Sequence, residues 1–175
     1  MQRFKQEVWE WLKALAPAIV LALVLRTFVL DNYIVDGSSM LPTLHDQERV
    51  LVYKLGQRFG ALPERGDIIV FQYAQDAERD FVKRVIGVTG DKVAITGGQV
   101  YVNDQPLDEP YLSAATLGDY GPITVQPDRV FVLGDNRNFS KDSRDALVGQ
   151  VSLEAIRGKA WLIYWPVKAW RLIGR

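Results

Sequence analysis

A pair of serines, Ser38 and Ser39, and a lysine, Lys83, are residues of this 175-residue chain whose types and surroundings could together support nucleophilic catalysis. Ser39 lies in the segment Asp-Gly-Ser-Ser-Met-Leu-Pro-Thr-Leu, residues 36–44. A small residue followed by hydroxyls at a sharp bend can expose a nucleophile and leave backbone N–H groups free to bind an oxyanion. The competing interpretation is an ordinary turn, in which the serine hydroxyls satisfy backbone groups.

Lys83 lies in an apolar run typical of a strand and shares its face with Phe81 and Val85. Because neighbouring strand residues point to opposite faces, Lys83 and Arg84 cannot both reach solvent if one face is covered, and we expect one to point inward. Arginine keeps its proton, whereas burial lowers the pKa of a lysine. A pKa of about 7–8 instead of ~10.4 would make Lys83 a competent general base. The alternative is an edge strand on which both cations extend into water.

A polar loop, Gly-Asp-Asn-Arg-Asn-Phe-Ser-Lys-Asp-Ser-Arg at residues 134–144, could orient that base. Its acidic and amide side chains alternate with arginines, a pattern that favours charge-assisted hydrogen bonds within the loop. A loop fixed in this way could present Ser140 to a lysine headgroup. The alternative is a solvated turn whose ion pairs contribute less than ~1 kcal/mol each.

The composition excludes several other kinds of site. Without cysteine the chain has no disulfide, thiolate nucleophile or cysteine-ligated metal, and the spacing of the carboxylates matches no metal site. Its single histidine, His45, lies in a polar turn, and we do not expect it to be catalytic. Lys and Arg equal Asp and Glu at 21 each, so no net positive field exists to hold a nucleic acid. We therefore expect neither a metal nor a cofactor.

An apolar run that could position this chemistry at a membrane spans residues 14–30, and its only charge is Arg26. A helix of that length reaches about 26 Å, slightly less than a ~30 Å hydrocarbon core, and Trp9 and Trp11 could extend it at the interface. A buried core helix, a cleaved signal peptide and a peripheral amphipathic helix are the alternatives. The N-terminal cations Arg3, Lys5 and Lys13 outweigh Arg26, so we expect that end to lie in the cytoplasm.

The chain after the anchor is predicted to be β-rich. It contains short apolar or β-branched runs separated by turn signals, without a repeat or a long linker. The C-terminal segment 161–170 is aromatic, and it could be a last strand or could lie against a bilayer. We thus expect a cytoplasmic N-terminus and anchor at residues 1–30 and an extracytoplasmic domain at 31–175. The predicted strands are 50–53, 67–71, 81–88, 92–95, 100–102, 123–125 and 130–133.

Four segments taken together resemble those of bacterial type I signal peptidases, in the single-anchor form. They are the Ser-Met-x-Pro-Thr-Leu of residues 39–44, the Arg-Gly-Asp-Ile of 65–68, the Val-Lys-Arg-Val-Ile-Gly of 82–87 with Gly-Asp at 90–91, and the loop 134–144. Each segment alone is a weak signal, but the four occur in the order and spacing of that family. The resemblance covers the chain from the predicted anchor to about residue 165.

The resemblance implies a role for particular residues. It makes Ser39 the nucleophile and Lys83 the general base, with Ser140 hydrogen-bonded to that lysine. It also implies an ion pair between Asp142 and Arg144 that shapes the site, and a supporting carboxylate at Asp135. The implied fold is an antiparallel, coiled and barrel-like β domain.

The oxyanion site departs from part of the family. Some members have a serine at the position of Gly37, so the hole here would depend mainly on the backbone N–H of Ser39 and the Gly37 region. Thr89 stands where proline is usual, and Gln47-Glu48 where Gly-Asp is usual. These departures leave the predicted dyad intact.

The resemblance further implies an endopeptidase that removes signal peptides from secretory preproteins after Ala-x-Ala-like sequences. An extended peptide directs alternate residues to the same side, so two shallow apolar pockets would select small residues. A monomer in the cell membrane, or in a thylakoid membrane, is expected. A self-cleaving repressor-type protease and a catalytically silent β domain that only binds partners are the other functions considered. The residues predicted to line the pockets are Tyr33, Val35, Met40, Val50, Val70, Phe81 and Val82.

Overall fold

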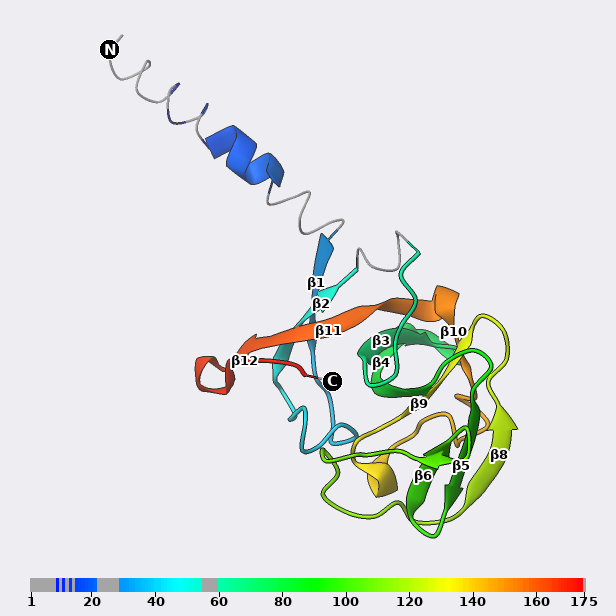
Figure 1. Ribbon diagram of the computed structural model, residues 1–175. Coiled ribbons are helices and arrows are strands. Elements are labelled where there is room, and N and C mark those ends of the chain that lie inside the picture. The colour runs from blue at the N-terminus through cyan, green and yellow to red at the C-terminus, as the bar shows by residue number, and fades with distance from the viewer. Residues whose placement is uncertain are drawn as a thin grey trace.

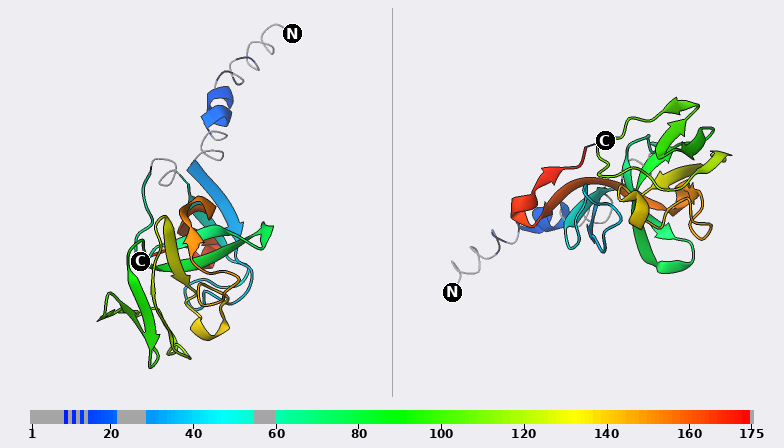
Figure 2. Two further views of the ribbon diagram at one scale, coloured as in Figure 1. Left: turned by 90° about the vertical axis from the view of Figure 1, so that its right-hand side faces the viewer. Right: turned by 90° about the horizontal axis from the view of Figure 1, so that it is seen from below.

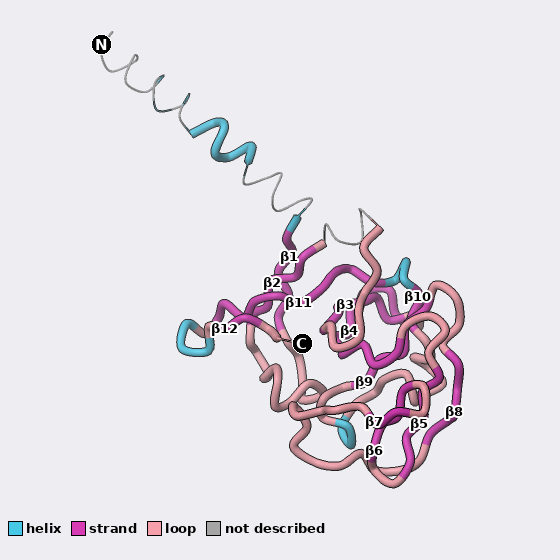
Figure 3. Tube along the Cα trace, viewed as in Figure 1, coloured by secondary structure: helices cyan, strands magenta, loops and turns pink. Residues whose placement is uncertain are grey.

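The computed structural model describes residues 9, 11, 13, 15–21, 29–54 and 60–174, which form two antiparallel β-sheets preceded by a helical segment at 15–21 (Figure 1). The smaller sheet, drawn in green, lies at the end of the molecule away from that helical segment (Figure 2). In Figure 3 the short strand β7 lies beside β6. The mainly antiparallel β fold predicted from the alternating apolar runs is therefore confirmed.

The larger sheet closes around the site, and the smaller sheet packs beside it. The larger sheet has the order β1 (Leu30–Ile34), β2 (Arg49–Tyr53), β11 (Ile156–Trp165), β3 (Ile68–Tyr73), β4 (Asp76–Gly87), β9 (Arg129–Leu133), β10 (Val151–Ser152), with β12 (Arg171–Leu172) paired to β11. The smaller has the order β7 (Gln105–Pro106), β6 (Gln99–Val102), β5 (Lys92–Thr96), β8 (Tyr120–Thr124). The described part of the chain also has short 3-10 helices at η2 (Arg137–Phe139), η3 (Leu153–Ala155) and η4 (Val167–Ala169).

Each of the seven predicted runs overlaps an observed strand. Side chains alternate between core and solvent in β2 and β5, whereas almost every residue of β3 and β9 is buried. In β2, Val50 and Val52 are buried while Arg49 and Tyr53 are exposed. The sequence did not predict β1, which begins within the residues assigned to the anchor, or most of β11. The aromatic C-terminal segment begins inside β11, where Ile163 is fully buried, so part of it is a strand of the core.

No helix in the described part of the chain is long and apolar enough to cross a membrane. The predicted anchor, residues 14–30, lies partly outside the described residues.

Three apolar clusters hold the sheets together, and two of them flank the site. The first joins Met40 and Leu44 of the serine turn to β2, β3 and β11. The second of these flanking clusters lies around Phe71 and Val85, and Phe81 packs against it. The remaining cluster lies between the smaller sheet and β9. The turn that carries Ser39 has buried apolar side chains before and after the serine. This packing fixes the turn relative to β4.

Candidate active site

The turn at residues 36–44 presents Ser39 between buried residues. Val35 precedes the turn with an exposed fraction of 6%, and Met40 follows Ser39 at 1%. Gly37 has a φ of +90°, a left-handed conformation that favours glycine, which explains why this residue type begins the bend. The backbone N–H of Asn136 donates to the Ser39 carbonyl at 3.0 Å, so the loop after β9 also holds the turn in place. Ser39 itself remains partly accessible.

Lys83 meets this turn from β4. Its Nζ donates to Ser39 Oγ at 2.8 Å and to the Val82 carbonyl at 2.8 Å, and the residue is only 4% exposed. Burial lowers the pKa of Lys83 to about 8, while the negative charges of Asp142 and Asp135 oppose that shift. A neutral amine at this position can accept the serine proton across the same contact.

The expectation that one of the two neighbouring cations points inward holds for Lys83, and Arg84 is buried as well. Arg84 is 2% exposed. Its Nε and Nη2 donate to Asp135 Oδ1 and Oδ2 at 2.9 and 2.7 Å, and its Nη1 donates to the Gly66 carbonyl. Both faces of β4 are covered here, and a bidentate pair with full hydrogen bonding makes a buried guanidinium tolerable.

The loop 134–144 is fastened by a second bidentate pair. Arg144 donates from Nε to Asp142 Oδ1 at 2.8 Å and from Nη2 to Oδ2 at 2.9 Å. Asp142 also accepts from the backbone N–H of Gly134 at 3.1 Å. Asp142 is 1% exposed, so this is a buried structural pair and not a solvated turn.

Ser140 lies beside the dyad without the predicted bond to the lysine. Its Oγ is buried and has no hydrogen-bond partner among the described residues. The loop and the serine turn approach each other closely at Gly134. A Cβ added there would lie 2.2 Å from Ser140 Oγ and 2.5 Å from the Ser39 carbonyl oxygen. The lysine instead directs its N–H groups to the serine of the turn and to its own strand.

The backbone N–H of Ser39 is a candidate oxyanion donor, since it makes no hydrogen bond within the described part of the chain. The N–H of Gly37 differs, because it donates to Asp46 Oδ1 at 2.8 Å. Gly37, which was predicted to belong to the oxyanion site, therefore shapes the turn and offers no free N–H to an oxyanion.

A cleft of about 230 Å³ contains both Ser39 and Lys83. Met40 does not line it, because its side chain is in the core behind the turn. Burial and the negative charges of Asp80 and Asp31 raise the pKa of Tyr33 to about 12, so its hydroxyl stays protonated. The other six residues predicted for the pockets do line the cleft: Tyr33, Val35, Val50, Val70, Phe81 and Val82.

Sequence reasoning missed several residues around the dyad. Lys141 and Asp80 line the cleft. The hydroxyl of Thr43 donates to Asp135, and the side chain of Asn136 donates to the Ser38 carbonyl at 3.0 Å. Thr43, Asn136 and Lys141 lie within the quoted motifs, so their positions were a signal, whereas Asp80 had no visible partner in the sequence.

His45 is exposed and lies 3.7 Å from Glu48, away from the dyad. Among the described residues, no group of three or more histidine, aspartate or glutamate side chains could hold a metal ion.

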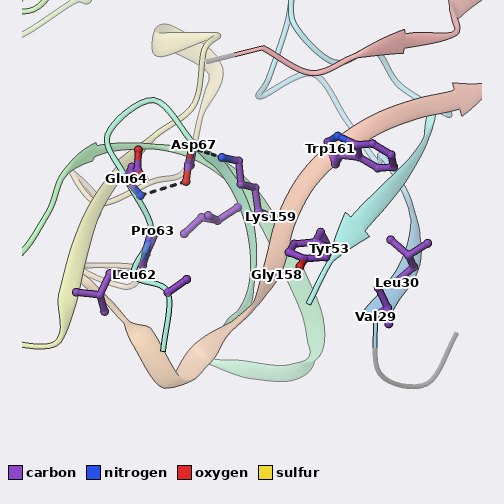
Figure 4. A pocket seen from close by; sticks show the side chains of 12 residues that line it. Val29, Leu30, Tyr53, Leu62, Pro63, Glu64, Asp67, Gly158, Lys159 and Trp161 are labelled. Atoms are coloured by element: carbon purple, nitrogen blue, oxygen red, sulfur yellow. Dashed lines mark hydrogen bonds and ion pairs between the residues drawn. The ribbon is translucent and has the colours of Figure 1, made fainter. Parts of the chain in front are cut away.

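A more apolar cavity, of about 590 Å³, lies apart from the dyad (Figure 4). Val29 and Leu30 at the start of β1 line it on one side and Trp161 of β11 on another. Figure 4 also shows the ion pair between Lys159 and Asp67 at its edge. None of the predicted catalytic residues lines this cavity.

The arrangement joins a reactive hydroxyl to a buried amine at the end of an apolar cleft. A buried amine within hydrogen-bond distance of a serine is the pairing that a nucleophile and its general base require. A backbone N–H next to that serine could bind an oxyanion. Groups of these kinds take part in acyl transfer.

The comparisons with known proteins identify the family of the chain. Residues 8–165 match the family model described as signal peptidase, peptidase S26. The chain is 39% identical to signal peptidase I S of Bacillus subtilis (strain 168), over 95% of this chain and 94% of that protein. It is 38% identical to signal peptidase I of Bacillus licheniformis, over 93% and 91%.

A more distant organism and a solved structure give the same result. The probable signal peptidase I-2 of Synechocystis sp. is 41% identical, over 89% of this chain and 72% of that protein. The crystal structure of a signal peptidase I from Enterococcus faecalis V583 superposes with a TM-score of 0.50 at 30% identity, covering 56% of this chain and 96% of that one. Because the sequence match spans nearly the whole of its relatives, the chain belongs to the signal peptidase I family, peptidase S26.

Proposed function

We propose that this signal peptidase cleaves its precursors with a dyad in which Ser39 is the nucleophile and Lys83 the general base. The observation that carries this proposal is the 2.8 Å contact between Lys83 Nζ and Ser39 Oγ, made by a lysine that is 96% buried and has a pKa of about 8. A lysine in this state is a base near neutral pH, whereas arginine does not give up its proton in proteins, and Arg84 is paired with Asp135.

In the acylation step, Ser39 Oγ attacks the carbonyl carbon of the scissile bond and its proton moves to Lys83 Nζ. The negative charge on the carbonyl oxygen is held by the backbone N–H of Ser39, and one good donor of this kind is typically worth ~3–4 kcal/mol. The ammonium of Lys83 then protonates the departing nitrogen, the C–N bond breaks, and the mature amino terminus leaves.

In the deacylation step, Lys83 takes a proton from water as the water oxygen attacks the ester. The tetrahedral intermediate collapses, the proton returns to Ser39 Oγ, and the signal peptide leaves with a carboxyl terminus. We keep Ser140 as an orienting residue, because its buried Oγ is available to accept a bond from the ammonium when Lys83 is charged. Asp142 and Arg144 fix the loop that carries it.

The substrate would enter as an extended strand between two free edges. Among the described strands, β1 pairs only with β2, and β4 pairs with β9 only from Arg84 onward. The open edge at Ile34 of β1 and the open edge at 80–82 of β4 therefore face the cleft, although the Val35 backbone groups bond to residues 47 and 48 and the Val82 carbonyl accepts from Lys83. A peptide lying there could bond to both edges and place its first and third residues before the cut against the valines. Shallow pockets of this kind would select small side chains, as in Ala-x-Ala.

We propose further that the apolar run 14–30 anchors the enzyme in the membrane, with the N-terminus in the cytoplasm and the domain from residue 31 outside. The tryptophans of the C-terminal region support this arrangement. Trp161, Trp165 and Trp170 are 48%, 50% and 62% exposed, and such residues are favoured at membrane interfaces. An anchored enzyme would meet secretory preproteins where their cleavage sites leave the bilayer.

The test is cleavage of a model precursor by the detergent-solubilised full chain, followed by mass spectrometry. We expect Ser39→Ala and Lys83→Ala to lose cleavage, and Lys83→Arg to lose it as well because arginine keeps its proton. Ser113→Ala and Lys168→Arg, at exposed positions, are the matched controls. Circular dichroism and thermal melting would show that each variant is folded.

The outcomes separate the possible functions. Normal turnover by Ser39→Ala or Lys83→Ala would refute the dyad. Binding of the precursor without cleavage by the unmodified chain would favour a catalytically silent domain. Cleavage of the chain itself but of no precursor would favour a self-cleaving protease.

A further inference from the structure

The cleft holds a second lysine that the dyad does not use. Lys141 follows Ser140 in the loop and lines the same cavity as Ser39 and Lys83. Unlike Lys83 it is exposed to solvent. It therefore adds an accessible positive charge to the cleft.

The ammonium of Lys141 is held at a defined place on the wall. Its Nζ donates to the hydroxyl of Tyr73 at 2.8 Å and lies 5.0 Å from the centroid of that ring. Tyr73 is 8% exposed and stacks on Phe81, with centroids 4.5 Å apart and an interplanar angle of 8°. Because the ring beneath it is packed, the cation is partly preorganised for a ligand.

Lys141 has no carboxylate partner of its own among the described ion pairs. The hydroxyl of Tyr73, and more weakly the charge of Asp145, raise the pKa of Lys141. It is therefore charged at the pH at which Lys83 becomes neutral. Asp80, which also lines the cleft, is already paired with Arg157 at 3.5 Å. Lys141 is thus a cation that can still take an anionic partner from a substrate.

The packing of the cleft indicates which substrate side chains could reach it. Val35, Val50, Val70 and Val82 belong to or pack against the cluster around Met40, which forms one wall. Phe81 packs against the other cluster, and Lys141 lies on that second wall because Tyr73 stacks on Phe81.

An extended peptide directs successive side chains to opposite walls. If the first and third residues before the cut face the valines, then the second residue before the cut and the first after it face Lys141. These two positions flank the scissile bond.

We propose that Lys141 is a specificity-determining residue that binds an acidic side chain at one of these two positions of a precursor. This inference rests on the proposed function, because it uses the peptide placement described there. A partly solvated ion pair contributes modestly, so the acidic residue should raise kcat/KM by roughly two- to fivefold.

The test compares precursors that differ only at the second position before the cut or the first after it, with Ala, Glu or Lys there. The full-length enzyme is used in detergent, and each rate is expressed relative to the Ala precursor of the same variant. The unmodified enzyme should prefer Glu over Lys at one or both positions, Lys141→Ala should lose the preference, and Lys141→Glu should reverse it. Added salt should weaken it.

Lys168→Glu, which makes the same charge change on η4, should keep the original order. The same substrate order in Lys141→Glu as in the unmodified enzyme would overturn the proposal. So would an equal loss on all precursors, because that result indicates that Lys141 only supports Tyr73. If the unmodified enzyme cleaves no precursor, both this proposal and the proposed dyad are refuted. If it cleaves precursors but shows one of the two results above, only the Lys141 proposal is refuted.

Discussion

The pH dependence of cleavage tests the central feature of the site, the buried lysine. Lys83 can accept a proton only when neutral, and burial lowers its pKa from 10.5 to about 8. At pH 7 a pKa of about 8 leaves roughly one enzyme in ten with a neutral Lys83, whereas an unshifted pKa would leave roughly one in 3,000. The fold therefore increases the active fraction at pH 7 by a factor of roughly 300.

The sign of the effect follows from the same equilibrium. Below the pKa the amine is charged, so kcat/KM should fall about tenfold for each pH unit below about 7. Above about pH 9 the amine is almost fully neutral, and the rate should level off. Since kcat/KM reports the free enzyme, the inflection should lie near the pKa of Lys83 in the folded, unoccupied site.

The assay is cleavage of a precursor without ionisable side chains near the cut, from pH 6 to 10.5 at constant ionic strength. A thermal melt at each pH would exclude unfolding as the cause of any loss. An inflection near 10.5, or a flat profile between pH 7 and 9, would refute the reasoning. Either result would mean that burial does not neutralise Lys83 or that another group is the base.

Two substitutions beside the dyad have distinct expected effects. Gly134→Ala places a Cβ 2.5 Å from the Ser39 carbonyl oxygen and 2.2 Å from Ser140 Oγ, so the turn must move and kcat/KM should fall on the order of 10²-fold. The control is Gly174→Ala, because a Cβ at Gly174 would have open space around it. Equal activity of Gly134→Ala and Gly174→Ala would contradict the predicted steric effect at Gly134. Arg144→Met leaves Asp142 without its bidentate partner. The negative charge of Asp142 is then no longer offset and should raise the pKa of Lys83, the proposed general base. Cleavage at pH 7.5 should then fall and recover above pH 9, and an unmoved inflection would count against this electrostatic account.

Local pattern was sufficient to predict most of the strands, and long-range pairing explains those that it missed. The run 30–34 carries Asp31 and Asn32 directly after an apolar segment, so nothing local distinguishes β1 from the end of a helix. Its strand conformation comes from pairing with β2, for example Tyr33 with Val50. In β11, Arg157 and Lys159 interrupt the apolar pattern, although both occupy partly or fully exposed positions.

The site was predictable where chemistry depends on neighbours in the chain and not where it depends on distant partners. The inward direction of Lys83 followed from its neighbours Phe81 and Val85. The burial of Arg84 did not, because its partner Asp135 lies 51 residues further along the chain. The hydrogen bond expected between Ser140 and Lys83 is absent from the described contacts, since residue order gives no information on which acceptor the amine chooses.

The low pKa of Lys83 depends on how the surrounding charges are paired. Two carboxylates, Asp135 and Asp142, lie close enough to raise that pKa, and a free carboxylate beside a buried amine would keep it charged. Each is instead held by both oxygens, the first by Arg84 and the second by Arg144. Because each carboxylate is paired with a guanidinium, its negative charge is partly offset beside the lysine. Burial is the largest influence on the pKa of Lys83, and we expect the two arginines to favour the neutral amine that the proposed mechanism requires.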